Sequence, residues 1–157
     1  MNELGTIIRE AAKKYSLDVQ LFASLIIQES SLNQYAYKYE DAFYRNHLHY
    51  LTKERMLGRV PTIPNMDSEK HFRAVSWGYT QILGETAREL GFEGQFLTEL
   101  LNPVVNIEYG AKYFSICLKK HGGDRVKSLL AYNGGGDLTY PDKVIARLAN
   151  KEYERVL

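Results

Sequence analysis

Apolar residues recur at spacings of three and four along most of the 157-residue chain, and no alternating run reaches the length of a typical strand. This period matches the turn of an α-helix and predicts an all-α fold. Helices are expected at about residues 4–15, 18–30, 84–90, 103–121, 124–132 and 141–148. At this length one domain, spanning residues 1–157, is expected to bury about two-thirds of the surface that its unfolded chain exposes.

The expected helix boundaries rest on residues that cap or end helices. Ser16 is expected to cap the second helix, while Asn102 and Pro103 start the long helix at about 103–121 and Gly122 ends it. The inward stripe of the long helix is expected to consist of Val104, Ile107, Ala111, Phe114 and Leu118, and that of the first helix of Ile7, Ile8, Ala11 and Tyr15.

The second helix carries an acid on its apolar stripe. Phe22, Leu25, Ile26 and Glu29 fall at offsets of 0, 3, 4 and 7. Burial and the C-terminal end of a helix both disfavour a carboxylate, so both favour the protonated form. An acid that stays protonated near neutral pH can donate a proton to a leaving oxygen, as glycosidic cleavage requires. Periodicity leaves two alternatives open: a solvated residue that ends the stripe, or a partner of a buried arginine.

Residues 34–76 interrupt the helical pattern. This segment holds five Tyr before residue 51, three of the four His, and the turn residues Pro61 and Pro64, with one helix expected near 45–57. Loops of this length are uncommon unless they are functional or disordered, and the aromatic content argues against disorder. The segment is therefore predicted to be an insertion with a role in function.

Composition narrows the class of ligand. The chain has 20 basic and 19 acidic residues and a formal net charge of +1, which does not favour nucleic-acid binding. Its 12 Tyr offer flat apolar rings with hydrogen-bonding tips, which suit a groove for a polar, ring-shaped ligand. The four His show no zinc-ligand spacing, so no metal or cofactor is expected, and Cys117 is expected to be a buried apolar residue.

Export and membrane signals are not visible in the sequence. The first residues include acids and lack the apolar stretch of a signal peptide, and no apolar run of 18 residues occurs. No membrane span is therefore expected.

Several short motifs occur in a fixed order. Glu29 and Ser30 follow an apolar helix, and after them come GYTQI (78–82), ETARELG (85–91), NPVVNIEYGAKYF (102–114) and LLAYNGG (129–135). Together these motifs, over about residues 10–148, resemble the soluble lytic transglycosylase domain, whose fold is similar to goose-type lysozyme. The resemblance implies a lysozyme-like helical fold, a peptidoglycan glycan strand as partner, and cleavage between N-acetylmuramic acid and N-acetylglucosamine with a 1,6-anhydro product. A monomer is expected.

The resemblance also implies roles for individual residues. Glu29 matches the single catalytic acid, and Ser30 the residue after it, which could equally form a helix-end hydrogen bond. The residues expected to assist catalysis or line the sugar groove are Gln81, Tyr132, Asn133 and Tyr140, and those that could stack on a sugar are Trp77 and Tyr79. Each has a structural alternative: core packing for the aromatic rings, a backbone hydrogen bond for Gln81 and a left-handed turn for Asn133.

The chain departs from the family pattern at three places. Glu29 and Gly78 are 49 positions apart, so residues 34–76 are expected to form one wall of the groove. Thr80 replaces a Met, and only eight positions separate Tyr132 from Tyr140. The insertion also brings four acids that could supply the second carboxylate of an inverting hydrolase or be solvated loop charges: Glu40, Asp41, Asp67 and Glu69.

Two other functions stay open at this point. One is a hydrolytic muramidase of the goose-lysozyme kind, in which water replaces the muramoyl 6-hydroxyl as nucleophile. The other is a non-catalytic glycan-binding module of a phage or secretion apparatus. All three functions place the protein at the cell wall, whether periplasmic, extracellular or phage-delivered.

Overall fold

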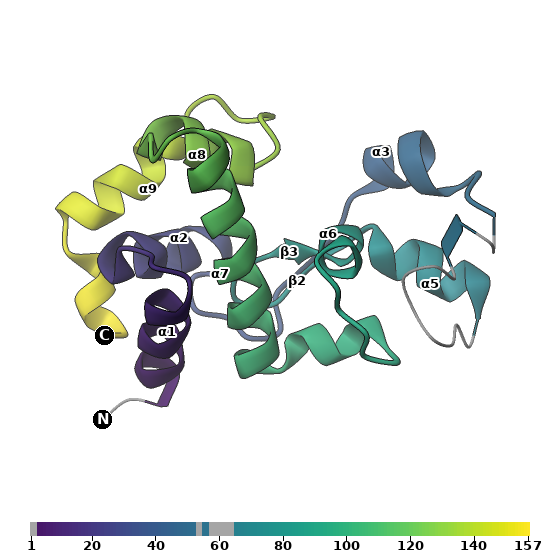
Figure 1. Cartoon of the computed structure of the whole chain (residues 1–157), viewed down its shortest axis with the longest axis horizontal. Helices are drawn as coiled ribbons and strands as arrows, with labels where there is room; N and C mark the ends of the chain where they lie inside the picture. Colours follow the sequence, from purple (N-terminus) through teal and green to yellow (C-terminus); the bar gives the residue numbers. More distant parts are fainter. Residues whose placement is uncertain (1–2, 53–54, 57–64) are drawn as a thin grey trace.

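The computed structural model describes residues 3–52, 55–56 and 65–157. Its helices are α1 (Glu3–Lys14), α2 (Val19–Ser30), α3 (Asp41–Phe43), η1 (Tyr44–Leu48), α5 (Met66–Arg73), α6 (Gly84–Glu89), η2 (Leu97–Leu101), α7 (Pro103–Lys120), α8 (Arg125–Tyr132), α9 (Tyr140–Ala149) and η3 (Glu152–Arg155). The strands are β1 (Tyr37–Tyr39), β2 (Val75–Trp77) and β3 (Ile82–Leu83). Figure 1 shows a larger helical part with α1, α2, α7, α8 and α9 beside a smaller part with α3, α5 and α6. The predicted helical, lysozyme-like fold class is confirmed.

Helix α2 lies at the centre of the larger part and packs against α1 and α9. Every residue from Leu21 to Ile27 is buried, so this helix is covered on all sides rather than along one stripe. The helix begins at Asp18, whose side chain accepts hydrogen bonds from Gln20 N and Leu21 N. The prediction that Ser16 is the cap is wrong, because Ser16 adopts a positive φ of 55° in the turn before it. The helix ends at Ser31, in the left-handed conformation.

Helix α7 packs across this core from the other side. Asn102 caps it by accepting hydrogen bonds from Val104 N and Val105 N, as predicted. Of the expected stripe, Ile107, Ala111 and Phe114 are buried, and the Phe114 ring stacks on Phe22 at 6.4 Å. The prediction for Val104 is wrong, since this side chain is 59% exposed in the first turn, where the helix extends past the core.

A small antiparallel sheet was not expected from the sequence. Within the described residues β2 lies between β1 and β3, with Lys38 opposite Ser76 and Trp77 opposite Ile82. The helix expected near 45–57 is replaced by a π-helical turn at Tyr44–Leu48. Within the rest of that expectation, residues 49–50 form a turn, 51–52 have no regular structure and 55–56 are helical, while 53–54 and 57 lie outside the described residues, as do Pro61 and Pro64.

Buried charges join the inserted segment to the rest of the smaller part. Glu69 of α5 accepts hydrogen bonds at 2.9 Å from Arg73 Nε and from Arg88 Nε of α6, and Glu85 pairs with Arg73 at 3.2 Å. Both guanidinium groups are almost fully buried. Breaking such a pairing from one side leaves an uncompensated buried charge, so the network fixes α5 against α6. A second apolar core, which includes Trp77, Ile82 and Leu100, packs next to it.

No helix in the described part of the chain is long and apolar enough to cross a membrane.

Candidate active site

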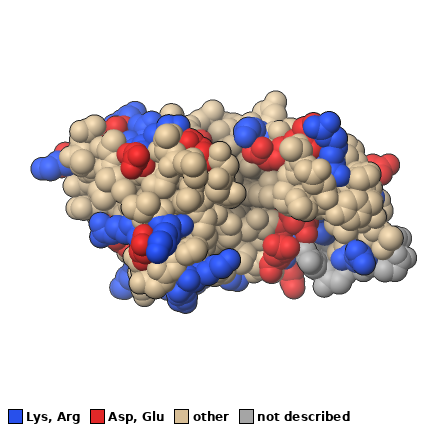
Figure 2. Space-filling view, turned by 90° about the horizontal axis from the view of Figure 1, so that it is seen from above, with Lys and Arg blue, Asp and Glu red and all other residues tan. Residues whose placement is uncertain are grey.

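A cavity of about 890 Å³ opens between the two parts of the molecule. It is lined on one side by residues from α2, α7, α8 and the loop after α8, and on the other by the inserted segment and by residues next to β3. Seen from above, the surface is hollowed between these two parts (Figure 2). A volume of this order suits an elongated ligand of several rings.

Glu29 reaches this cavity from the last turn of α2. The apolar run that precedes it is buried throughout, so the carboxyl sits where the core meets the cavity. Burial raises the pKa of Glu29 from its usual 4.5 to about 7, although a hydrogen bond from Tyr140 and the charge of Lys38 lower it. An acid with this pKa is present in both protonation states near neutral pH, as a group that first donates and then accepts a proton must be.

Tyr140 donates a hydrogen bond to Glu29 Oε1. It is the first residue of α9, its side chain is only 4% exposed, and α9 packs directly on α2. Burial and the neighbouring Glu29 charge both raise the pKa of Tyr140, so its hydroxyl remains a donor. The hydrogen bond holds the carboxyl in one orientation.

Tyr132 lines the cavity from the end of α8, but its hydroxyl is already engaged. It donates to Thr80 O at 2.8 Å, and its ring packs edge-on against Phe114 at 5.8 Å. Burial followed by the charge of Glu29 raises the pKa of Tyr132 well above its usual value. Tyr132 therefore holds the loop that contains Thr80 and Gln81 next to the acid.

Asn106 of α7 fixes the same loop through side-chain hydrogen bonds. This fully buried side chain donates to Trp77 O at 2.7 Å and to Leu100 O at 2.8 Å, and its Oδ1 accepts from Thr80 N at 2.8 Å. Gly78 lies against it with a φ of +66°, and a Cβ there would come within 2.5 Å of the Asn106 amide nitrogen. The close approach therefore requires glycine at position 78.

Gln81 lines the cavity at the end of this loop, in the left-handed conformation with a φ of 48°. Its Nε2 donates to Ala36 O at 3.1 Å and to Gly78 O at 2.9 Å. Gln81 thus forms the backbone hydrogen bonds considered as its structural alternative and also lies in the cavity lining, while its contact with a sugar stays a prediction. With Nε2 used twice, Oε1 is the atom that can accept a hydrogen bond from a ligand.

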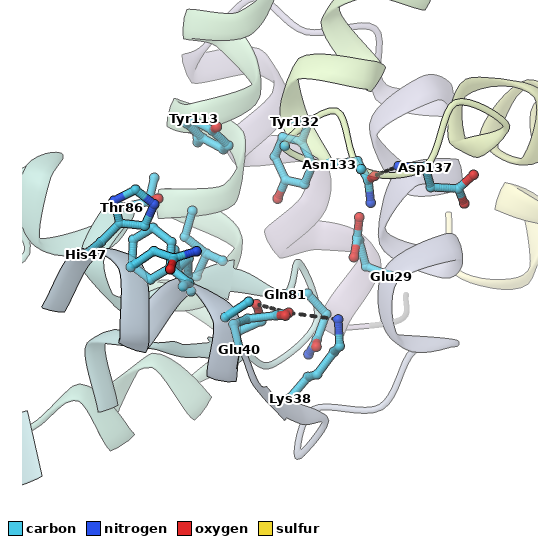
Figure 3. Close-up of a pocket in the computed structure, with 18 residues that line it drawn as sticks. Glu29, Lys38, Glu40, His47, Gln81, Thr86, Tyr113, Tyr132, Asn133 and Asp137 are labelled. Atoms are coloured by element: carbon cyan, nitrogen blue, oxygen red, sulfur yellow. Dashed lines mark hydrogen bonds and ion pairs between the residues drawn. The ribbon is translucent and has the colours of Figure 1, made fainter. Parts of the chain in front are cut away.

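Asn133 follows Tyr132 and lies directly above Glu29, with its amide nitrogen turned toward the acid (Figure 3). Its Oδ1 accepts a hydrogen bond from Asp137 N at 3.2 Å, which orients the amide. The left-handed turn considered for Asn133 is wrong, because its φ is −74° and the positive φ values fall on Gly134 and Gly135.

The inserted segment forms the opposite wall of the cavity, as predicted. Lys38, Glu40, Phe43 and His47 line it there. Of the other acids considered, Asp41 is exposed and pairs with Arg45 at 2.7 Å, and Asp67 is exposed at the start of α5.

Glu69, the fourth candidate for a second carboxylate, is buried in the arginine network away from the cavity. Of these four candidates, Glu40 is the one that lines the cavity.

Three residues expected near a ligand lie elsewhere. Trp77 is buried in the second core, where its Nε1 donates to Phe72 O at 3.1 Å, so the expected stacking on a sugar is wrong. Tyr79 is half-buried and packs against the first core. Ser30 donates to Ile26 O at 3.3 Å, which is the helix-end hydrogen bond considered as the alternative.

Sequence reasoning missed Lys38 and Asn106. The alternation of aromatic and charged residues at 37–40 was a signal for the strand that presents Lys38, and Asn106 stood within a motif without a role. Within the described ranges no group of three or more His, Cys, Asp or Glu residues is arranged to hold a metal ion.

Comparison with known proteins agrees with the resemblance carried by the motifs. A family model described as the transglycosylase SLT domain matches residues 6–143. Comparison with curated proteins gives no match, and neither does comparison with solved structures. Since the family model spans most of the chain, from α1 into α9, the chain belongs to the transglycosylase SLT domain family.

Proposed function

We propose that this protein is a peptidoglycan lytic transglycosylase that cleaves the β-1,4 bond between N-acetylmuramic acid and N-acetylglucosamine, with Glu29 as both acid and base. The observation that carries the proposal is a carboxyl with a pKa of about 7 that enters a cavity from a buried helix and is oriented by Tyr140. Family membership supplies the substrate class.

In the proposed reaction the protonated Glu29 gives its proton to the glycosidic oxygen. The bond between C1 of the muramoyl residue and that oxygen breaks, and its electron pair stays on the leaving N-acetylglucosamine. The 6-hydroxyl oxygen of the muramoyl residue then bonds to C1, and its proton passes to the Glu29 carboxylate. The cycle thus returns the acid to its starting state and consumes no water.

The other cavity residues support this assignment by position. Tyr140 restricts the rotation of the carboxyl, and Asn133 lines the same cavity with its amide nitrogen turned toward the acid (Figure 3). Gln81 offers Oε1 to a hydroxyl or acetamido N–H of a sugar in the cavity.

Replacement of the acid tests the proposal. Glu29→Gln should release no muropeptides from isolated sacculi, because the amide cannot donate the proton, while its far-ultraviolet circular dichroism stays that of the parent. Glu10→Gln, which changes an exposed acid on α1, is the matched control and should keep full activity. Turnover by Glu29→Gln within a few-fold of the parent would contradict the assignment of Glu29 as the catalytic acid and base.

A hydrolytic muramidase is the second candidate, because Glu40 brings another carboxylate to the same cavity. Mass spectrometry of the released muropeptides separates the two. Anhydro ends support the transglycosylase, and reducing ends require that water is the nucleophile.

A further inference from the structure

The wall opposite Glu29 carries a pair of opposite charges. Lys38 and Glu40 are two positions apart, and this period places their side chains on the same face of the β1 strand. Glu40 N continues the strand ladder by donating to Ala74 O at 2.8 Å. Tyr39, between them, points the other way and stacks with His71 at 6.1 Å. The strand therefore separates an aromatic outer face from a charged face turned to the cavity.

The Glu40 carboxylate is held in place on that face. Its Oε1 lies 3.0 Å from Lys38 Nζ and accepts a hydrogen bond from Ser76 Oγ at 3.3 Å. Ser76 is buried on β2, directly opposite Lys38 in the register. Both contacts use the same oxygen, and Glu40 also lines the cavity.

Figure 3 shows Lys38 and Glu40 on the opposite side of the cavity from Tyr132 and Asn133, with Glu29 between them. A sugar ring bound between Glu29 and the wall formed by Lys38 and Glu40 would have the Glu29 carboxyl on one side and the Glu40 carboxylate on the other. Glycosidic cleavage passes through a transition state in which the anomeric carbon carries positive charge. A fixed carboxylate that faces this carbon stabilises the charge as it develops.

We propose that Glu40 is a second catalytic carboxylate, which stabilises the positive charge at the anomeric carbon while Glu29 transfers the proton, with Lys38 and Ser76 as its positioning residues. This inference rests on the proposed function and adds a residue from the insertion to it. The role is electrostatic: Glu40 forms no bond to the sugar and takes no proton from water.

The pair also acts on Glu29 itself, in opposite directions. The charge of Glu40 raises the pKa of Glu29, and that of Lys38 lowers it. Among the described residues, the other ionisable side chains around Glu29 are Tyr140 of α9 and Tyr132 of α8, with Tyr113, Asp137 and His47 further along the cavity lining. Since Glu29 must be protonated to act, loss of activity on the alkaline side follows its pKa.

The experiment measures kcat, KM and the pH profile on solubilised peptidoglycan strands. Glu40→Gln should lower kcat about tenfold or more with KM nearly unchanged, as expected for an interaction made mainly in the transition state. It should also move the alkaline limb of the pH–activity profile to lower pH, because the charge that raises the pKa of Glu29 is lost. Lys38→Gln should move that limb to higher pH for the opposite reason. Glu40→Asp, which keeps the charge, should recover part of kcat.

Asp41→Asn is the matched control, because Asp41 is adjacent in the chain, exposed and paired with Arg45. It should behave as the parent. A kcat for Glu40→Gln within about twofold of the parent would overturn the inference, as would alkaline limbs that fail to move apart in the two variants. A parent that releases reducing ends, with these ends lost and anhydro ends kept in Glu40→Gln, would show that Glu40 acts as a base on water and would also overturn the inference. An inactive parent would instead overturn the proposed function, and this inference with it.

Discussion

Replacing Glu29 by Gln should stabilise the fold, and the gain should grow with pH. The pKa of Glu29 is about 7 in the folded protein, against a usual value of 4.5. Because the folded state holds this proton more tightly than the unfolded state, folding is penalised as pH rises above 4.5, and the penalty is complete above about pH 7. Gln stays neutral throughout and carries no such penalty.

The size of the effect follows from the shift. One pKa unit corresponds to about 1.4 kcal/mol, so the shift of Glu29 corresponds to at most about 3 kcal/mol at pH 8 and to less than about 1 kcal/mol at pH 5. Water in the cavity screens part of this, and we expect a gain of about 2 kcal/mol at pH 8 relative to pH 5. The amide oxygen of Gln can still accept the hydrogen bond from Tyr140, so that contact is retained.

Urea unfolding of parent and variant at pH 5, 6, 7 and 8 measures this difference. Equal m-values would show that both proteins expose the same surface on unfolding, so the difference in midpoint reports stability. Glu10→Gln, at an exposed position, controls for the removal of one negative charge from the surface. If the free energies of unfolding of parent and Glu29→Gln change with pH in parallel across this range, Glu29 does not have a raised pKa in the folded protein. That result would refute the prediction.

Two further variants test the groups around the acid. Tyr140→Phe removes the hydrogen bond that lowers the pKa of Glu29, so the alkaline limb of the activity profile should move to higher pH; a limb that stays in place or moves down would contradict the contact. Asn106→Ala leaves a buried N–H and two buried carbonyls without their partner and should cost about 2–4 kcal/mol in urea unfolding, with a loss of kcat as the loop that carries Gln81 loosens. Unchanged stability would show that water takes the place of the amide.

The helices could be predicted because local information is enough to specify them. The long helix from Pro103 has an Asn cap, a proline start and an apolar stripe, and each signal lies within the segment itself. The sheet could not be predicted in the same way, since its strands contain only two or three residues and β1 pairs with a partner almost forty positions away. A pattern this short does not distinguish a strand from a loop.

The candidate site could be anticipated at Glu29 and was missed at Lys38 and Asn106 for the same reason, and the catalytic role of Glu29 stays a prediction. Glu29 was found because it breaks an apolar stripe, which is a local signal. Its contact with Tyr140 joins residues 111 positions apart and depends on how α9 packs on α2. Glu69 was read as a candidate loop acid and is the centre of a buried arginine network, because burial is decided by tertiary packing. That the chain forms a single domain stays a prediction.

The two walls of the cavity act on the acid through different physical effects. Helix α2 raises the proton affinity of Glu29 by desolvation, and this effect depends on the same apolar packing that stabilises the larger part of the fold. The β1 strand and the residue after it add a cation and an anion whose effects on that proton oppose each other, so the pair lowers the pKa of Glu29 less than Lys38 would alone. Two opposite charges cancel at a point only where they are equally distant from it, so the proposed role of Glu40 requires its carboxylate to lie closer to the anomeric carbon than the Lys38 ammonium does. On the proposed roles, the insertion would thus add a stabilising charge beside the reacting carbon while the pKa of the proton donor stays at about 7.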